Sequence, residues 1–321
     1  MEIINDLLYV YKIAEVSDYF WPPGGARYEI QWMKHNKPFD VGMKIKENSI
    51  IFADAFFIDK FYDVFGSIDV PFYLISAESD FIIPYQSKNN PIDSSLKLLE
   101  NKCLIKWFSI NIGLNHPKLI SIPLGIPKHI PFIINDKDNF MGWKYHFDLD
   151  EINSQIQILL SNLNLSLNNF FNENKKLLYS RMTVTSSQHC LHSYENIRNI
   201  VVESLKNNIF IDSSLVPWHQ YMYELKDYKF CLSLPGKGLD CYRTWESLTL
   251  GVIPIVLKTD FSGDLYNDLP VLQLQEEELK NINESFLENE FLKIKERQNT
   301  FNFKKLTTDW WKKYIFNNIK T

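Results

Sequence analysis

The sequence predicts an α/β protein with two consecutive Rossmann-like domains facing a cleft, each built on a parallel sheet. Short apolar runs such as 50–53 and 72–76 alternate with helical patterns, and this alternation is typical of β–α–β units. Apolar residues make up 45% of the chain and charged residues 23%, as in ordinary folded proteins. The 321 residues have room for two domains of about 150 residues each.

The first half contains four predicted strands and one clear helix. Phe57, Phe61 and Phe65 recur at i, i+4 and i+8, which predicts a helix between the first two strands. The predicted strands are 50–53, 72–76, 104–110 and 119–123. We expect an acceptor-side domain over residues 1–150.

The polar, Asn-rich segment 135–174 predicts the domain junction. We expect a second domain over 151–300 and a C-terminal helix within 301–321, with the C-terminal helices packing back toward the first domain. The predicted strands of this half are 177–179, 230–234 and 253–257, and the predicted helices are 194–206, 218–225, 242–250, 276–296 and 306–319.

Composition excludes several classes of protein. The net charge is −5 and no basic block occurs, so nucleic acid is not an expected partner. Residues 1–16 lack a basic region before an apolar core, unlike a secretory signal. No apolar run reaches the roughly 20 residues that span a bilayer. The four cysteines form no CxxC pair, which favours reduced thiols. We therefore expect a soluble, cytoplasmic protein, and its oligomeric state stays open.

Arginine is rare in this chain. Only five residues are arginine: Arg27, Arg181, Arg198, Arg243 and Arg297. In a lysine-rich background, an arginine often serves where its planar, bidentate group is needed, as in phosphate or carboxylate recognition. The alternative for each is an ordinary surface ion pair.

The strongest local pattern runs from Lys229 to Val256. It is a buried strand, a loop with Gly236 and Gly238, a helix, a glycine turn and a second buried strand. Ligands of open α/β sheets bind at the carboxyl ends of strands, where this loop lies. The glycines allow close approach of the backbone to a ligand, and the helix N-terminus can bind a diphosphate.

Two charged residues lie on one face of that helix. Arg243 and Glu246 are three positions apart, so their side chains are neighbours. Arg243 can clamp phosphate oxygens, and Glu246 can accept hydrogen bonds from ribose hydroxyls. The alternative is an intrahelical ion pair on a solvated face.

This stretch resembles the C-terminal motif of exostosin-like glycosyltransferases, in which a K-F-C-L strand leads through a Pro/Gly loop to R-x-x-E and then G-x-I-P. Weaker matches are Ser79-Asp80 and the segments 116–118 and 122–127. The resemblance implies a GT-B protein that transfers sugar from a nucleoside-diphosphate sugar, UDP- or GDP-linked, to a glycan or glycoprotein acceptor. It further implies inversion, no bound metal and no other cofactor.

Inverting transfer needs a base from the first domain. We expect Asp80, which follows a predicted strand, with Glu78 as its competitor; the alternative is that Asp80 caps a turn before Pro84. The predicted donor-site residues are Arg181, Arg198, Ser233, Pro235, Gly236, Gly238, Asp240, Tyr242, Arg243 and Glu246. For Arg198 a plain surface position is the alternative.

Aromatic residues give two further candidates. Trp218-His219 could stack on the nucleotide base or belong to the core. The rigid loop 21–28 could stack on sugar or form a surface turn.

Other motifs favour different chemistry. Asp136-Lys137-Asp138 and Asp148-Leu149-Asp150 spell DxD, which binds metal and diphosphate in metal-dependent glycosyltransferases, but we interpret them as solvated loop carboxylates. The 189–192 segment, His-Cys-Leu-His, lacks a fourth metal ligand at a useful spacing. The remaining alternative is a catalytically inactive GT-B protein that binds carbohydrate or serves as a scaffold.

Overall fold

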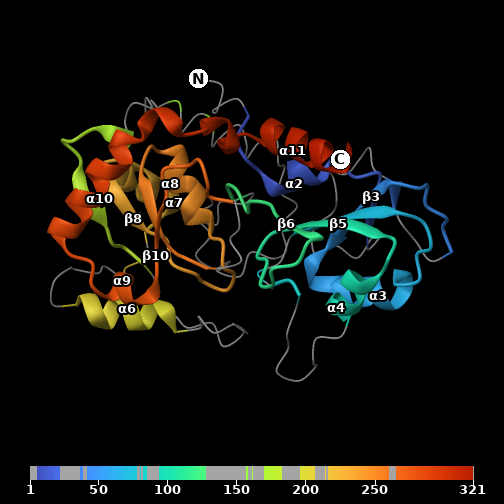
Figure 1. Ribbon diagram of the computed structural model, residues 1–321. Coiled ribbons are helices and arrows are strands. Elements are labelled where there is room, and N and C mark those ends of the chain that lie inside the picture. Colours follow the sequence, from blue (N-terminus) through green and yellow to red (C-terminus); the bar gives the residue numbers. More distant parts are fainter. Residues whose placement is uncertain are drawn as a thin grey trace.

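The structure, a computed structural model, describes most of two parallel sheets and their helices (Figure 1). The residues described are 6–21, 37–38, 42–77, 80, 82–84, 94–127, 157, 161, 170–182, 196–206, 214, 216–259 and 265–320. The predicted junction at 135–174 falls almost wholly outside them, so the domain boundary at residue 150 stays a prediction.

The first sheet is entirely parallel over its described strands. Its order is β2-β1-β3-β4-β5-β6. The strands are β1 (Tyr19–Trp21), β2 (Lys37–Pro38), β3 (Ser49–Asp54), β4 (Phe72–Ala77), β5 (Leu104–Ser109) and β6 (Leu119–Ser121). The central strands β3 and β4 are buried along their whole length, as expected for a parallel sheet covered on both faces.

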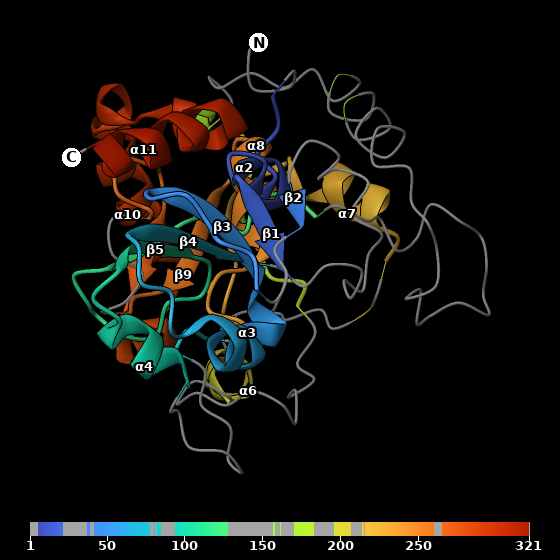
Figure 2. The same cartoon turned by 90° about the vertical axis from the view of Figure 1, so that its right-hand side faces the viewer.

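Successive residues of β3 pack in two different hydrophobic clusters. Ile51 packs in a cluster with Phe61 and Leu98, which come from α3 (Ile58–Phe65) and α4 (Ser94–Glu100). Ile50 belongs to a second cluster with Ile315. Figure 2 shows α3 and α4 on one side of this sheet, with α2 (Val10–Ala14) and α11 (Thr308–Lys320) on the other.

The second sheet is also parallel, in the order β10-β9-β8-β7. Its strands are β7 (Lys176–Tyr179), β8 (Tyr228–Leu232), β9 (Ile253–Leu257) and β10 (Leu272–Leu274). The helices around it are α6 (Ile197–Leu205), α7 (Trp218–Leu225), α8 (Tyr242–Thr249), α9 (Glu276–Lys280) and α10 (Glu284–Glu296). Short 3-10 turns occur at Ala55–Phe57, Gln298–Thr300 and Phe303–Leu306.

The C-terminal helix α11 returns to the first sheet, as predicted. It lies beside α2 (Figure 1), and the Tyr73 hydroxyl of β4 donates to the carbonyl of Ile319 at 2.9 Å. At the start of α11, the buried Thr308 hydroxyl donates to the carbonyl of Leu7 at 2.6 Å. The C-terminal segment therefore connects the second half of the chain to the first through these contacts.

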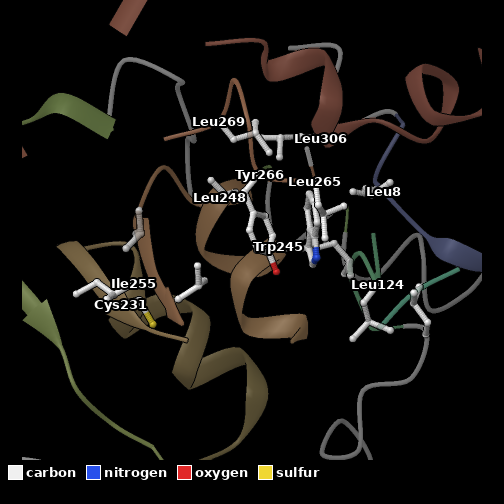
Figure 3. Packing of buried hydrophobic residues seen from close by; sticks show 14 of the residues in the cluster. Leu8, Leu124, Cys231, Trp245, Leu248, Ile255, Leu265, Tyr266, Leu269 and Leu306 are labelled. Carbon is white, nitrogen blue, oxygen red and sulfur yellow. The ribbon is translucent and has the colours of Figure 1, made fainter. Parts of the chain in front are cut away.

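One hydrophobic core spans both halves. It includes Ile50 and Leu124 of the first half and Trp245 and Tyr266 of the second. Figure 3 shows Trp245 and Tyr266 grouped together, with Leu124 and Leu8 on the side of the first half. The two sheets are consequently held by shared packing as well as by the chain termini.

The predicted strands and most predicted helices are confirmed, with shifts of up to three residues at their ends. The single helix predicted over 276–296 is wrong at Asn281–Asn283, where the chain breaks between α9 and α10. The Asn283 side chain accepts a hydrogen bond from the Phe286 N–H and begins a new helix there, as asparagine commonly does.

Candidate functional site

The loop after β8 forms a compact turn. Ser233 extends the ladder by donating its N–H to the Ile255 carbonyl at 2.9 Å. Its hydroxyl is hydrogen-bonded to the hydroxyl of Thr244 at 2.8 Å, which ties the loop to α8. The Gly236 N–H donates to the Gly238 carbonyl at 3.0 Å. The loop is thus fixed at the carboxyl end of a parallel strand, where such sheets bind ligands.

A cavity of about 400 Å³ opens beside this loop. Asp80 and Leu124, which follow β4 and β6, line it from the first half of the chain. Its volume is typical of a small-molecule site. The predicted site residues that line it are Asp80, Arg181, Arg198, Gly236, Gly238, Asp240, Tyr242, Arg243 and Glu246. Ser233 and Pro235 are buried in the loop and are not among the described lining residues.

The two loop glycines allow close approach of side chains from elsewhere in the protein. A Cβ at Gly236 would lie 2.8 Å from the Arg198 guanidinium, and one at Gly238 would lie 2.5 Å from the Asn111 amide. The close contacts that the structure describes at these glycines are with Arg198 and Asn111, and close approach of a ligand to the loop stays a prediction.

Asp240 has a structural role that the sequence did not indicate. Its carboxylate is 5% exposed. One oxygen accepts from the Leu124 N–H and the Trp245 indole, each at 2.8 Å. The other accepts from the Tyr266 hydroxyl at 2.8 Å and from the Cys241 N–H at 2.9 Å. These four bonds hold the carboxylate in place, and a donor-binding role for Asp240 stays a prediction.

The backbone of Asp240 is also held by the first half of the chain. Its N–H donates to the side-chain oxygen of Asn111 at 2.9 Å. Asn111 is buried and has φ of 52°, a left-handed conformation that asparagine tolerates better than most residues. Both sheets therefore converge on Asp240.

Arg243 and Glu246 lie on the inner face of α8. Glu246 is 5% exposed and accepts from the Trp218 indole at 2.7 Å. Arg243 donates to the Arg181 carbonyl at 2.9 Å, and its guanidinium lies 5.6 Å from the centre of the Tyr221 ring. The alternative of an ion pair on a solvated face is wrong, because this face of α8 is turned into the cavity.

Burial changes the protonation behaviour of this face. Desolvation raises the pKa of Glu246, against hydrogen bonding from Trp218 and the charge of Arg243. Burial alone would lower the pKa of Arg243, but the neighbouring Tyr221, Cys231 and Glu246 outweigh it and raise that pKa. The guanidinium accordingly stays charged beside the cavity.

Three of the five arginines in the chain line this cavity: Arg181, Arg198 and Arg243. Arg198 of α6 donates to the carbonyls of Leu234 and Pro235, each at 3.0 Å. Arg181, directly after β7, donates to the Ser214 hydroxyl at 2.5 Å and pairs with Glu224 at 3.3 Å. The bonds of Arg198 to the loop carbonyls argue against a plain surface position for that residue. Arg181 does form an ion pair, at a partly exposed position beside the cavity.

Asp80 is an exposed residue just beyond the end of β4, and it lines the cavity. It is the carboxylate that the first half contributes to the described lining. Glu78, its competitor, lies outside the described residues, so the choice between the two stays open.

Sequence reasoning missed Lys237 and Tyr221. Lys237 is exposed and lines the cavity from the tip of the Gly236–Gly238 turn. A cation between two glycines at a strand's carboxyl end was the signal that could have found it. Trp218 belongs to the core and orients Glu246, which favours the core alternative over base stacking.

Several sequence candidates lie outside the described residues. They are Pro22–Tyr28 with Arg27, Asp136, Asp138, Asp148, Asp150, His189, Cys190 and His192. Within the described part of the chain, no three or more His, Cys, Asp or Glu side chains are grouped to hold a metal ion. No described helix has the length and apolarity to cross a membrane.

No protein-family model matches the sequence, and no curated protein matches it. A solved structure described as "Trehalose-6-phosphate from E. coli bound with UDP-2-fluoro glucose" is similar over 86% of this chain and 74% of its own, with 8% identity and a TM-score of 0.40. At that level neither a ligand nor a residue's role transfers, and membership of the exostosin-like family stays a prediction.

Asp240→Asn should lower the free energy of unfolding by about 3 kcal/mol, because the amide leaves buried donors without an acceptor. Chemical denaturation measures the change. Asp69→Asn, at an exposed position between α3 and β4, is the control and should change stability by less than about 0.5 kcal/mol. An equal loss of unfolding free energy in the two variants would contradict the structural role of the Asp240 carboxylate.

Glu246→Gln should change how stability depends on pH. The folded protein holds the Glu246 proton more tightly than the unfolded chain because burial raises its pKa. Stability is therefore lost as pH rises from the ordinary value of 4.5 toward the raised one, by up to about 1.4 kcal/mol per pH unit. Chemical denaturation at several pH values measures this. Between pH 4.5 and the raised pKa of Glu246, the free energy of unfolding should fall less for the variant than for the wild type. The same dependence of unfolding free energy on pH in the two proteins would contradict a raised pKa of Glu246.

Proposed function

We propose that the protein is an inverting, metal-independent glycosyltransferase that moves a sugar from a nucleoside-diphosphate sugar to a hydroxyl of a glycan acceptor. The observation that carries the proposal is the cavity at the carboxyl end of β8. Lys237, Arg198, Arg243 and Glu246 from the second half of the chain line it together with Asp80 from the first half.

The cations suit a diphosphate. Lys237 is exposed at the turn, the Arg198 guanidinium contacts that turn, and Arg243 belongs to the first turn of α8. Lysine and arginine are the side chains that bind phosphate oxygens best, and the N-terminus of α8 adds a positive dipole end. These groups can offset the charge of the departing diphosphate in place of a metal ion.

Glu246 suits the ribose. A carboxylate has about four acceptor sites on its two oxygens, so the bond from Trp218 leaves others for ribose hydroxyls. The same bond holds the Glu246 side chain in one orientation, which favours a defined position for the nucleoside.

Asp80 suits the general base. In the proposed step its carboxylate takes the proton of the acceptor hydroxyl as that oxygen bonds to the anomeric carbon. The bond from that carbon to the diphosphate oxygen breaks at the same time, and the electron pair leaves with the diphosphate. Attack from the side of Asp80, opposite the cationic wall, inverts the anomeric centre.

Calorimetric titration with UDP and GDP in the presence of EDTA tests the donor site. We expect one of the two nucleotides to bind and EDTA to leave its affinity unchanged. Lys237→Ala should weaken that binding about tenfold through loss of one charged contact, while binding of the uncharged nucleoside should not change.

Lys258→Ala is the matched control, since Lys258 is an exposed lysine in the same half that is not among the described cavity residues. Binding that EDTA abolishes would favour a metal-dependent enzyme that uses Asp136 and Asp138. Absence of binding to either nucleotide would favour a carbohydrate-binding or scaffold protein.

Asp80→Asn should abolish transfer while leaving nucleotide affinity intact, because the amide keeps the shape of the side chain but cannot take a proton. The rate of donor hydrolysis or transfer, measured over a panel of nucleotide sugars, tests this together with calorimetry. Normal turnover by the variant would remove Asp80 from the mechanism.

A further inference from the structure

A second cavity, of about 590 Å³, lies between the edge strand β6 and the C-terminal helix α11. The residues that matter to its chemistry are His116, Asp268, Lys305, Trp310, Trp311 and Tyr314. The proposed transfer step uses none of these residues.

The two cavities share no described lining residue. Asn111 and Tyr266 both hydrogen-bond to Asp240, which lines the first cavity. Their chain neighbours Ile112 and Leu265 line the second. The second cavity is therefore a separate site and not an extension of the first.

One wall of the second cavity is aromatic. The Trp310 and Tyr314 rings stack at 13° with centroids 5.2 Å apart, and both residues are partly exposed. Trp311 stands at 80° to Trp310, with centroids 4.7 Å apart, and its indole N–H donates to the Lys305 carbonyl at 2.8 Å. The wall is thus fixed before any ligand binds.

The facing groups are polar and of mixed charge. Nδ1 of His116 accepts from the Lys118 N–H at 3.1 Å, which leaves Nε2–H as a donor on the neutral ring. Burial and the charge of Lys118 lower the pKa of His116 and favour that neutral form. Asp268 offers a carboxylate, and the buried Lys305 ammonium is bonded to the Asn267 carbonyl at 2.6 Å.

From this combination we propose that the second cavity binds a neutral pyranose ring. The C–H face of a pyranose packs on aromatic rings, and its hydroxyls both donate and accept hydrogen bonds, as imidazole and carboxylate groups require. The cationic cluster that marks a phosphate site is absent from the described lining, where Lys305 is the single lysine or arginine. Its ammonium lies 5.6 Å from the centre of the Trp310 ring. The site would hold a sugar of a longer glycan away from the reacting hydroxyl.

Saturation-transfer NMR and calorimetry with methyl glycosides of glucose, galactose, mannose and N-acetylglucosamine test the proposal, with uridine as the competing aromatic ligand. At least one glycoside should bind the wild-type protein at millimolar concentration. Trp310→Ala should weaken it about tenfold, and Trp310→Phe should restore most of the affinity.

Phe316→Ala is the control, since Phe316 is an exposed aromatic residue of the same helix that is not among the described cavity residues. Thermal unfolding reports whether each variant folds; where Trp310→Ala does not, His116→Ala on the opposite wall gives the same test. Absence of glycoside binding, binding that survives both substitutions, or uridine displacing the glycoside would overturn the proposal.

This experiment needs no nucleotide. A protein that binds glycoside through Trp310 but no UDP or GDP would contradict the donor site and leave the second site standing. The reverse result would contradict the second site alone.

Discussion

The buried carboxylate of Asp240 is the interaction on which the rest of the site depends. Its oxygens accept from Leu124 of the first half and from Trp245 and Tyr266 of the second. The backbone N–H of Asp240 also donates to the Asn111 side chain of the first half. A buried carboxylate is costly unless its oxygens accept hydrogen bonds, so these partners must all be in place. Burial still raises the pKa of Asp240. The loop that frames the first cavity and the relative position of the two sheets are therefore determined together.

The hydrogen bonds of Asp240 also bring the cationic side chains of one half of the chain into the same cavity as a carboxylate of the other half. The wall from the second sheet carries Lys237, Arg198 and Arg243, whereas Asp80 comes from the first. Removal of a proton and departure of an anion in a single step require a carboxylate and cationic groups in one cavity. Because these residues come from different halves of the chain, the site forms only when the contacts around Asp240 hold the two sheets together.

The sequence predicted much of the fold because its parallel strands are short, buried and continuous, as in 72–76, and because residues such as Phe57, Phe61 and Phe65 mark a helix within one local window. The elements α2, β1, α4 and β10 were not predicted, because their few residues show neither a long continuous apolar run nor a clear period. The sequence indicated that Arg243 and Glu246 lie on one face of α8, since they are three positions apart in one helix. The contacts of Asp240 with Leu124 and Asn111 cross more than a hundred residues, and no local pattern indicates them.

A crystal structure of the protein with a bound nucleoside diphosphate tests the central claim most directly. The account predicts diphosphate oxygens within about 3 Å of the Lys237 ammonium or the Arg198 guanidinium, as hydrogen bonding requires, with the ribose hydroxyls on Glu246. A nucleotide bound in the Trp310 cavity, or on neither of these groups, would contradict it.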